Sequence, residues 1–142
     1  MRRLLERRFR AEVGVDAAWR HLARVEAWPS WARHIKKVVL DPPGRLGPDS
    51  SGTIHLRGGP RSTFRMVELV PGSSWRWVGP FLWLTVSYDH RFRAVGERET
   101  ELTFVVDAEG PGVGLLGPLF ARIYARNLDR AIPNLVAELE AP

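Results

Sequence analysis

The residue best placed to do chemistry is His90, which lies between Tyr88 and Phe92 at alternate positions of a strand-like segment. Alternate residues of a strand point to the same face, so we expect this imidazole on an apolar face. There it could hydrogen-bond a ligand or act as a general base near neutral pH. A buried histidine whose hydrogen bonds are satisfied by its neighbours is the structural alternative.

A second polar residue interrupts an apolar stripe near the end of the chain. At ~100° per residue, Asn127 projects close to Phe120, Tyr124 and Ala131 on a helix. A buried amide without a partner costs roughly 1–3 kcal/mol, so some polar group should face it. Water or a neighbouring side chain would satisfy the amide, and so would a carbonyl or hydroxyl group of a ligand. The sequence leaves both interpretations open.

The other motifs do not build a metal or nucleotide site. There are four histidines without HExxH-type spacing and there is no cysteine, so we expect no metal. Residues Gly112 to Gly117 spell GxGxxG between a strand and a helix, but no strand follows that helix to close a dinucleotide-binding βαβ unit. We interpret the motif as a glycine hinge into the terminal helix and expect no cofactor.

Tryptophan is frequent, with 6 in 142 residues. Burial of such a large ring stabilises a fold only where something covers it. Trp28 and Trp31 flank Pro29 and Ser30, and we expect an elbow there between two short helices. Proline should hold Trp28 outside helical geometry, and Ser30 should cap the second helix. Most of the rings are expected in the core, and aromatic lining of an apolar pocket is the alternative.

The elements that must position these residues follow from the hydrophobic periodicity. We expect a first strand at 4–13, a short helix after an Asp16 N-cap, the second short helix after Ser30, and a long helix at 115–139. Further strands are expected at 35–40, 53–57, 61–70, 74–78, 82–94 and 100–108. Short Gly- and Pro-containing links, among them Gly79-Pro80, favour an antiparallel meander. One helix after such a meander implies an α+β fold with the sheet wrapped over the helix.

Composition narrows the class of protein. The 142 residues are typical of one domain, 1–142, and 44% are hydrophobic. No segment is apolar enough for a signal peptide or a membrane span, and the lack of cysteine fits a reducing compartment, so we expect a soluble cytoplasmic protein. The net charge of +5 comes from singly scattered residues, mostly arginine. We therefore expect no nucleic-acid partner, although a basic stripe on one face stays open.

Four motifs lie in this order of elements. They are Val15-Asp16-Ala17-Ala18-Trp19, Trp28-Pro29-Ser30-Trp31, Glu68-Leu69-Val70-Pro71-Gly72, and Thr103 to Gly110 before the last helix. Together they resemble the START-like or SRPBCC superfamily, which has the helix-grip fold, and within it the polyketide cyclase/dehydrase-like branch. The resemblance covers essentially the whole chain. It implies a curved antiparallel sheet of about seven strands that grips the C-terminal helix around a deep, mostly apolar cavity.

The resemblance also implies a function. Members bind lipids, sterols, quinones, hormones or polyketide intermediates, and we favour binding of a small hydrophobic or aromatic ligand in the cavity. The alternative is a polyketide cyclase/dehydratase-type enzyme, in which His90 or Tyr124 moves protons in an aldol condensation or loss of water. A third reading is an adaptor that presents its basic surface and uses no cavity. No acid/base pair suited to neutral pH is recognisable, which argues against the enzyme.

The expected partner is thus a small hydrophobic molecule, and the sequence leaves open whether the chain forms a homodimer. The residues expected to touch that molecule are those that place an aromatic ring or a polar group on the inner faces of the sheet and the terminal helix. They are Trp28, Trp31, Phe64, Trp77, Tyr88, His90, Phe92, Phe104, Phe120, Tyr124 and Asn127.

Overall fold

The computed structural model describes residues 1–142, and its elements follow the order predicted from the sequence. Strand β1 (Arg2–Ala11) leads into helix α1 (Val15–Ala23) and the 3-10 helix η1 (Val25–Ser30). Six strands follow, namely β2 (Ile35–Asp41), β3 (Ser51–Leu56), β4 (Arg61–Val70), β5 (Ser74–Phe81), β6 (Leu84–Gly96) and β7 (Glu99–Glu109). The long helix α2 (Val113–Glu140) comes last.

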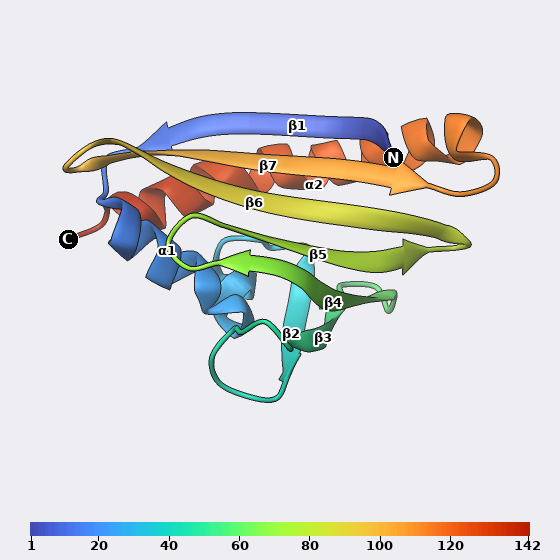
Figure 1. The fold of residues 1–142 in the computed structure, drawn as a ribbon, viewed down its shortest axis with the longest axis horizontal. Coiled ribbons are helices and arrows are strands. Elements are labelled where there is room, and N and C mark those ends of the chain that lie inside the picture. The colour runs from blue at the N-terminus through green and yellow to red at the C-terminus, as the bar shows by residue number, and fades with distance from the viewer.

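All strands belong to one seven-stranded antiparallel sheet, in the order β1-β7-β6-β5-β4-β3-β2. The meander from β2 to β7 is completed by β1, the first strand of the chain, which pairs with β7. Figure 1 shows α2 running along the β1–β7 side of the sheet, while β2, β3 and β4 lie at the other side. Helix α2 packs against β1, β7 and α1. The predicted α+β arrangement, a sheet wrapped over a terminal helix, is confirmed.

Strand β6 carries His90 to the inner face of the sheet. His90 and Phe92 are buried, whereas Arg91 and Arg93 are exposed. This alternation follows from the period of two in a strand, with an apolar inner face and a polar outer face. The inward direction predicted for His90 is therefore confirmed.

Part of the protein's positive charge is used in salt bridges between neighbouring strands. On the outer face of the sheet, Glu101 of β7 accepts from Arg93 at 3.0 Å and lies 3.7 Å from Arg10 and 4.0 Å from Arg8. The hydrogen bond from Arg93 is the main cause that lowers the pKa of Glu101. These arginines come from β1 and β6, the two strands that flank β7. Their charge stabilises cross-strand pairs and is not a free basic stripe.

A glycine occupies the N-cap of each of the two α-helices, α1 and α2. Gly14, and not the predicted Asp16, occupies the N-cap of α1, and Asp16 lies in the first turn, where its carboxylate faces the positive end of the helix. Gly112 is the N-cap of α2 with a φ of +75°. Gly117 lies inside α2, where a Cβ would come within 2.8 Å of Leu4 on β1. These two glycines of the motif therefore serve a helix start and close packing.

The elbow around Trp28 differs from the prediction. Helix η1 runs through Pro29 and ends at Ser30, so Trp28 lies inside a helix and no second helix begins at Ser30. The fixed φ of proline, about −65°, suits a 3-10 turn as well as an extended link, which the sequence cannot distinguish. The Ser30 hydroxyl donates to Glu138 of α2 at 3.1 Å instead of capping. Trp28 is anchored by its Nε1, which donates to the Leu22 carbonyl at 2.8 Å.

The turn between β5 and β6 also differs from the prediction. The sequence predicts it at Gly79-Pro80, but both residues belong to β5 and the chain reverses at Leu82 and Trp83. Gly79 is required for another reason, because a Cβ there would overlap the carbonyl oxygen of Thr63 on β4. The glycine therefore allows close approach of two strands and not a reversal of the chain.

The loop at Leu82 holds a bulky residue in a strained conformation. Phe81 pairs with Leu84, which leaves two loop residues, and φ at Leu82 is +54°. A positive φ costs an L-residue roughly 1–2 kcal/mol, whereas glycine adopts it readily and is preferred at the first position of a type II′ turn. Leu82 is 64% exposed, so its side chain contributes little burial. We expect Leu82→Gly to raise the free energy of unfolding by up to about 1 kcal/mol in urea titrations.

The neighbouring loop residue provides the control. Trp83 does not have a positive φ, and its Nε1 donates to the Pro111 carbonyl at 2.6 Å. Glycine at this position would remove that bond and give the unfolded chain more freedom, so Trp83→Gly should lower stability. Equal losses in both variants would show that Leu82 is not strained.

Candidate ligand-binding site

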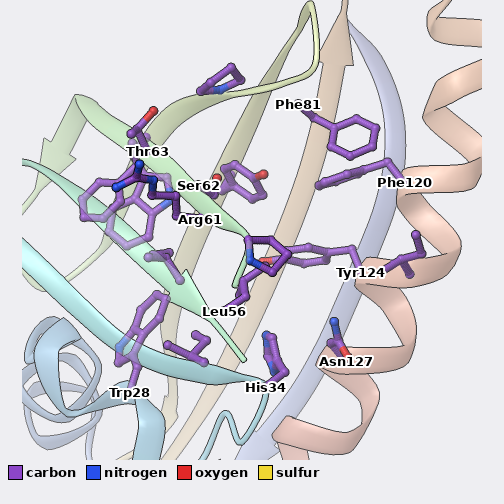
Figure 2. Close-up of a pocket in the computed structure, with 18 of the residues that line it drawn as sticks. Trp28, His34, Leu56, Arg61, Ser62, Thr63, Phe81, Phe120, Tyr124 and Asn127 are labelled. Atoms are coloured by element: carbon purple, nitrogen blue, oxygen red, sulfur yellow. The ribbon is translucent and has the colours of Figure 1, made fainter. Parts of the chain in front are cut away.

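A cavity of about 390 Å³ lies between the inner face of the sheet and α2 (Figure 2). This volume falls within the roughly 300–1,000 Å³ typical of small-molecule sites. Its walls come from η1, the start of β2, the β3–β4 hairpin, β5, β6 and the first half of α2. Of the residues that line it, 12 of 20 are hydrophobic. The apolar cavity implied by the family resemblance is therefore present.

Aromatic rings face the cavity from both sheet and helix. Phe64 of β4 stacks on Trp77 of β5 with 4.1 Å between centroids, and Trp28 lies 5.4 Å from Trp77. On the helix, Phe120 and Tyr124 are one turn apart and stack at 5.6 Å. Figure 2 shows both helix rings directed toward the sheet. An apolar or aromatic molecule between them would contact ring faces on two sides.

His90 contributes a neutral imidazole to this cavity. It is only 5% exposed, and its Nδ1 lies 3.3 Å from the carbonyl oxygen of Trp75. A carbonyl can only accept, so Nδ1 carries the hydrogen and Nε2 is left as an acceptor. Burial lowers the pKa of His90 to about 4, against the opposing effect of the Trp75 bond. His90 is thus uncharged at pH 7.

Two tyrosines approach each other from opposite walls. Tyr88 of β6 and Tyr124 of α2 have ring centroids 5.6 Å apart. Burial raises the pKa of Tyr124 to about 12, and burial together with the neighbouring Tyr124 raises the pKa of Tyr88 further. Neither hydroxyl is hydrogen-bonded to a protein group, and neither is sealed away from the cavity. Both hydroxyl groups stay protonated near neutral pH and can donate to a ligand.

Asn127 and His34 form a polar end of the cavity. Asn127 comes from α2 and His34 from the link between η1 and β2, and the two side chains lie near each other in Figure 2. Burial lowers the pKa of His34, which favours its neutral form. The amide of Asn127 interrupts the apolar stripe where that stripe faces the cavity, so it need not be buried in the core.

The cavity offers several hydrogen-bonding groups and few charged ones. No aspartate or glutamate lines it, and Arg61 is its one permanently charged residue. General acid–base catalysis needs a group whose pKa lies near the working pH. Burial moves the pKa of His90 down and that of Tyr124 up, away from neutrality in both cases. No group of three His, Cys, Asp or Glu side chains comes together to hold a metal ion.

Most residues predicted from the sequence to touch a ligand line this cavity. They are Trp28, Phe64, Trp77, Tyr88, His90, Phe120, Tyr124 and Asn127. Their role in binding stays a prediction.

The other three predicted residues lie in the core. Trp31 is buried beside Trp28, with 5.3 Å between centroids. Phe92 packs 5.2 Å from Trp19 of α1, because α1 covers this end of β6. Phe104, on β7, is buried 5.4 Å from Phe9 of β1, on the side of the sheet against which α2 packs. Each ring points inward as expected, but a helix or a neighbouring ring fills the space that a ligand would need.

Several lining residues are absent from the sequence-based set. Ile54 and Leu56 alternate on β3, and this pattern could have identified them. Phe81 is absent because the sequence predicts the β5–β6 turn at Gly79-Pro80, whereas β5 extends to Phe81. The remaining residues come from the η1–β2 link and the start of β2, the β3–β4 hairpin, the end of β5, the β5–β6 turn and α2. They are His34, Ile35, Pro60, Arg61, Ser62, Thr63, Pro80, Leu82 and Ile123.

None of the helices combines the length and apolar character that crossing a bilayer demands.

Comparisons with known proteins agree with this architecture. Among solved structures, the fold is similar to that of the Zhui aromatase/cyclase from Streptomyces sp. R1128, with 19% identity, a TM-score of 0.68, and 95% of this chain and 92% of that chain covered. It is also similar to a START superfamily protein from Mycobacterium smegmatis, with 11% identity, a TM-score of 0.70 and coverages of 96% and 97%. Ginseng major latex-like protein 151 from Panax ginseng shows 13% identity, a TM-score of 0.73 and coverages of 95% and 95%.

Sequence comparison identifies the family. No curated protein matches the chain significantly. The profile of the family described as polyketide cyclase / dehydrase and lipid transport matches residues 3–140. The predicted polyketide cyclase/dehydrase-like family is thereby confirmed, and the similar START-like structures confirm the predicted helix-grip fold. The chain belongs to the polyketide cyclase / dehydrase and lipid transport family.

Proposed function

We propose that the protein binds a small hydrophobic or aromatic molecule in the 390 Å³ cavity and releases it unchanged. One observation carries this proposal: apolar walls surround polar groups that have no partner within the protein. These groups are the hydroxyls of Tyr88 and Tyr124, the Nε2 of His90 and the amide of Asn127. Burial of apolar ligand surface contributes roughly 25 cal/mol per Å², and the polar groups orient the ligand.

The enzymatic alternative draws its support from the fold. The similar structures include the Zhui aromatase/cyclase, and a cyclase would use His90 or Tyr124 to move protons. The pKa of about 4 for His90 and of about 12 for Tyr124 argues against this chemistry at neutral pH. Native mass spectrometry of the purified protein, followed by rebinding of any co-purified molecule, separates the two functions. A binder returns that molecule with its mass unchanged, whereas a dehydratase returns it lighter by one water.

The cavity predicts binding of a neutral aromatic probe. N-phenyl-1-naphthylamine becomes fluorescent in apolar surroundings and carries no charge. Leu56, half-buried on β3, lines the cavity, so the larger ring of a Leu56→Trp variant should occupy part of that space. We expect the wild-type protein to bind the probe with micromolar affinity, and Leu56→Trp to weaken it about tenfold or more. Fluorescence titration gives both dissociation constants.

A matched variant controls for the added ring. Val67 on β4 is 37% exposed and does not line the cavity. Val67→Trp should bind the probe as the wild-type protein does. If both tryptophan variants bind with the wild-type affinity, the probe lies elsewhere and the proposed function is wrong.

A further inference from the structure

We infer that the ligand is an amphiphile with an anionic end, and that Arg33 and Arg130 hold this end in a polar recess beside the apolar cavity. The inference rests on the proposed function, because it names the class of molecule that the cavity binds. The recess has a volume of about 300 Å³. It is lined by Arg33, His34, Asn127, Arg130, Ala131 and Asn134.

The recess and the apolar cavity are adjacent and share a boundary. His34 and Asn127 line both spaces. On α2, residues Asn127, Arg130 and Asn134 are three and seven positions apart, so they lie along one side of the helix. This row of polar side chains continues from the aromatic row of Tyr124 toward the C-terminus. A molecule that fills the apolar cavity can therefore extend past the shared boundary into polar surroundings.

The recess carries positive charge that the protein does not neutralise. No aspartate or glutamate lines it, and neither Arg33 nor Arg130 takes part in a salt bridge. The two carboxylates nearby in sequence on α2 already have partners. Asp129 pairs with Arg7 at 2.7 Å, and Glu138 pairs with His21 at 2.9 Å. The arginines on the outer face of the sheet, by contrast, converge on Glu101.

Two free guanidinium groups around one recess select an anion. A guanidinium presents paired N–H donors that match the oxygens of a carboxylate or a phosphate. Both arginines are exposed, so an anionic group between them keeps much of its hydration. The apolar cavity is a poor place for the same group, because Tyr88, Tyr124 and His90 are neutral and transfer of a bare charge into apolar surroundings is costly. The anionic end therefore lies in the recess, and the apolar body lies between the aromatic walls.

Arg61 is the competing cation. It lies with Ser62 and Thr63 on β4, away from His34 and Asn127 in Figure 2. Arg61 does not line the polar recess. An anion held by Arg61 would place the ligand in the opposite direction, so a variant of Arg61 decides between the two ends of the cavity.

Two probes with the same aromatic body test the inference. N-phenyl-1-naphthylamine is neutral, and 8-anilino-1-naphthalenesulfonate adds one permanently ionised sulfonate, which stands in for a carboxylate or phosphate. The double variant Arg33→Gln/Arg130→Gln should weaken binding of the sulfonate about three- to tenfold and leave binding of the neutral probe unchanged. The double variant Arg65→Gln/Arg98→Gln removes the same charge from exposed residues outside both spaces and should change neither affinity. Added salt should reduce the advantage of the sulfonate.

Alkyl competitors then identify the anion. Dodecanol, dodecanoate and dodecyl phosphate share one chain, and each is tested for displacement of the neutral probe. Both anions should compete better than the alcohol, and the better of the two identifies the ligand as a carboxylate or a phosphate. This preference should disappear in Arg33→Gln/Arg130→Gln.

The outcomes separate this inference from the proposed function. If the neutral probe fails to bind the wild-type protein, the proposed function is wrong and the inference falls with it. If the neutral probe binds but the sulfonate affinity is unaffected by Arg33→Gln/Arg130→Gln, only the inference is wrong. Loss of sulfonate binding in Arg61→Gln alone would likewise overturn the inference, because the anion would then lie on the β4 side.

Discussion

Replacement of Trp75 by alanine is expected to lower the free energy of unfolding by about 3–5 kcal/mol. Trp75 is 0% exposed and is the largest fully buried side chain. Its ring lies 5.3 Å from Trp19, 4.5 Å from His90 and 5.7 Å from Phe92. Alanine would leave a hole between α1 and the sheet that these rings cannot fill without leaving their rotamers. Urea titration at pH 7, followed by circular dichroism, measures the loss.

The indole nitrogen of Trp75 makes a second variant informative. Its Nε1 is the one side-chain nitrogen or oxygen that is both fully sealed inside the protein and without a hydrogen-bond partner. An unsatisfied buried donor costs roughly 1–3 kcal/mol, so part of the packing gain is offset in the wild-type protein. Trp75→Phe keeps a ring against Trp19 and His90 and removes the orphaned N–H. We therefore expect it to cost less than half as much as Trp75→Ala.

Trp83 is the matched control for ring removal. It is 62% exposed, and its only polar contact is the bond to the Pro111 carbonyl. Trp83→Ala should therefore change stability by less than about 1 kcal/mol. A loss as large as that of Trp75→Ala would show that burial does not decide which tryptophans stabilise this fold.

Local periodicity predicts the elements of this fold because each signal is contained within its own segment. The alternation in β6 and the apolar stripe of α2 both depend on residues a few positions apart, and both are correct. The β5–β6 turn was missed because Gly79 and Pro80 have the composition of a turn. Their actual role depends on Thr63 in another strand. The strain at Leu82 is likewise visible only once the pairing of β5 with β6 is known.

The division of the aromatic residues between cavity and core could not be predicted from the sequence. Phe92 and His90 occupy equivalent positions on β6, two residues apart. Helix α1 covers the end of β6 that carries Phe92, whereas the space beside His90 stays open. The polar recess depends on a still longer contact, since it joins Arg33 to Arg130 on α2. Such placements follow from how the helices cover the sheet, and no short-range pattern records them.

Acidification from pH 6.5 to pH 4 is expected to remove about 3 kcal/mol of stability through His90 alone. The pKa of His90 is about 4 in the folded protein, against about 6.5 for an exposed histidine. Between these values the unfolded chain binds a proton that the folded protein does not, so stability falls as pH falls. Above pH 6.5 both states are neutral and His90 contributes no slope. A difference of about 2.5 pKa units at 1.36 kcal/mol each gives the stated magnitude.

Substitution of His90 by phenylalanine isolates this contribution. The side chain is enclosed by Trp28, Trp75, Trp77 and Phe104, and none of these rings titrates. Asp89, the adjacent residue on β6, favours the charged imidazole only slightly compared with the effect of burial. Phenylalanine keeps a ring in this aromatic cage and removes the ionisable group. As pH rises from 4 to 6.5, the free energy of unfolding of wild type should therefore increase by about 3 kcal/mol relative to that of His90→Phe. Urea titrations at pH 4.0, 5.0, 6.5 and 7.5 test this. A difference that is independent of pH would mean that the pKa of His90 is the same in the folded and the unfolded protein, near 6.5. His90 could then exchange a proton near neutral pH, and the pKa argument against the enzymatic alternative would be lost.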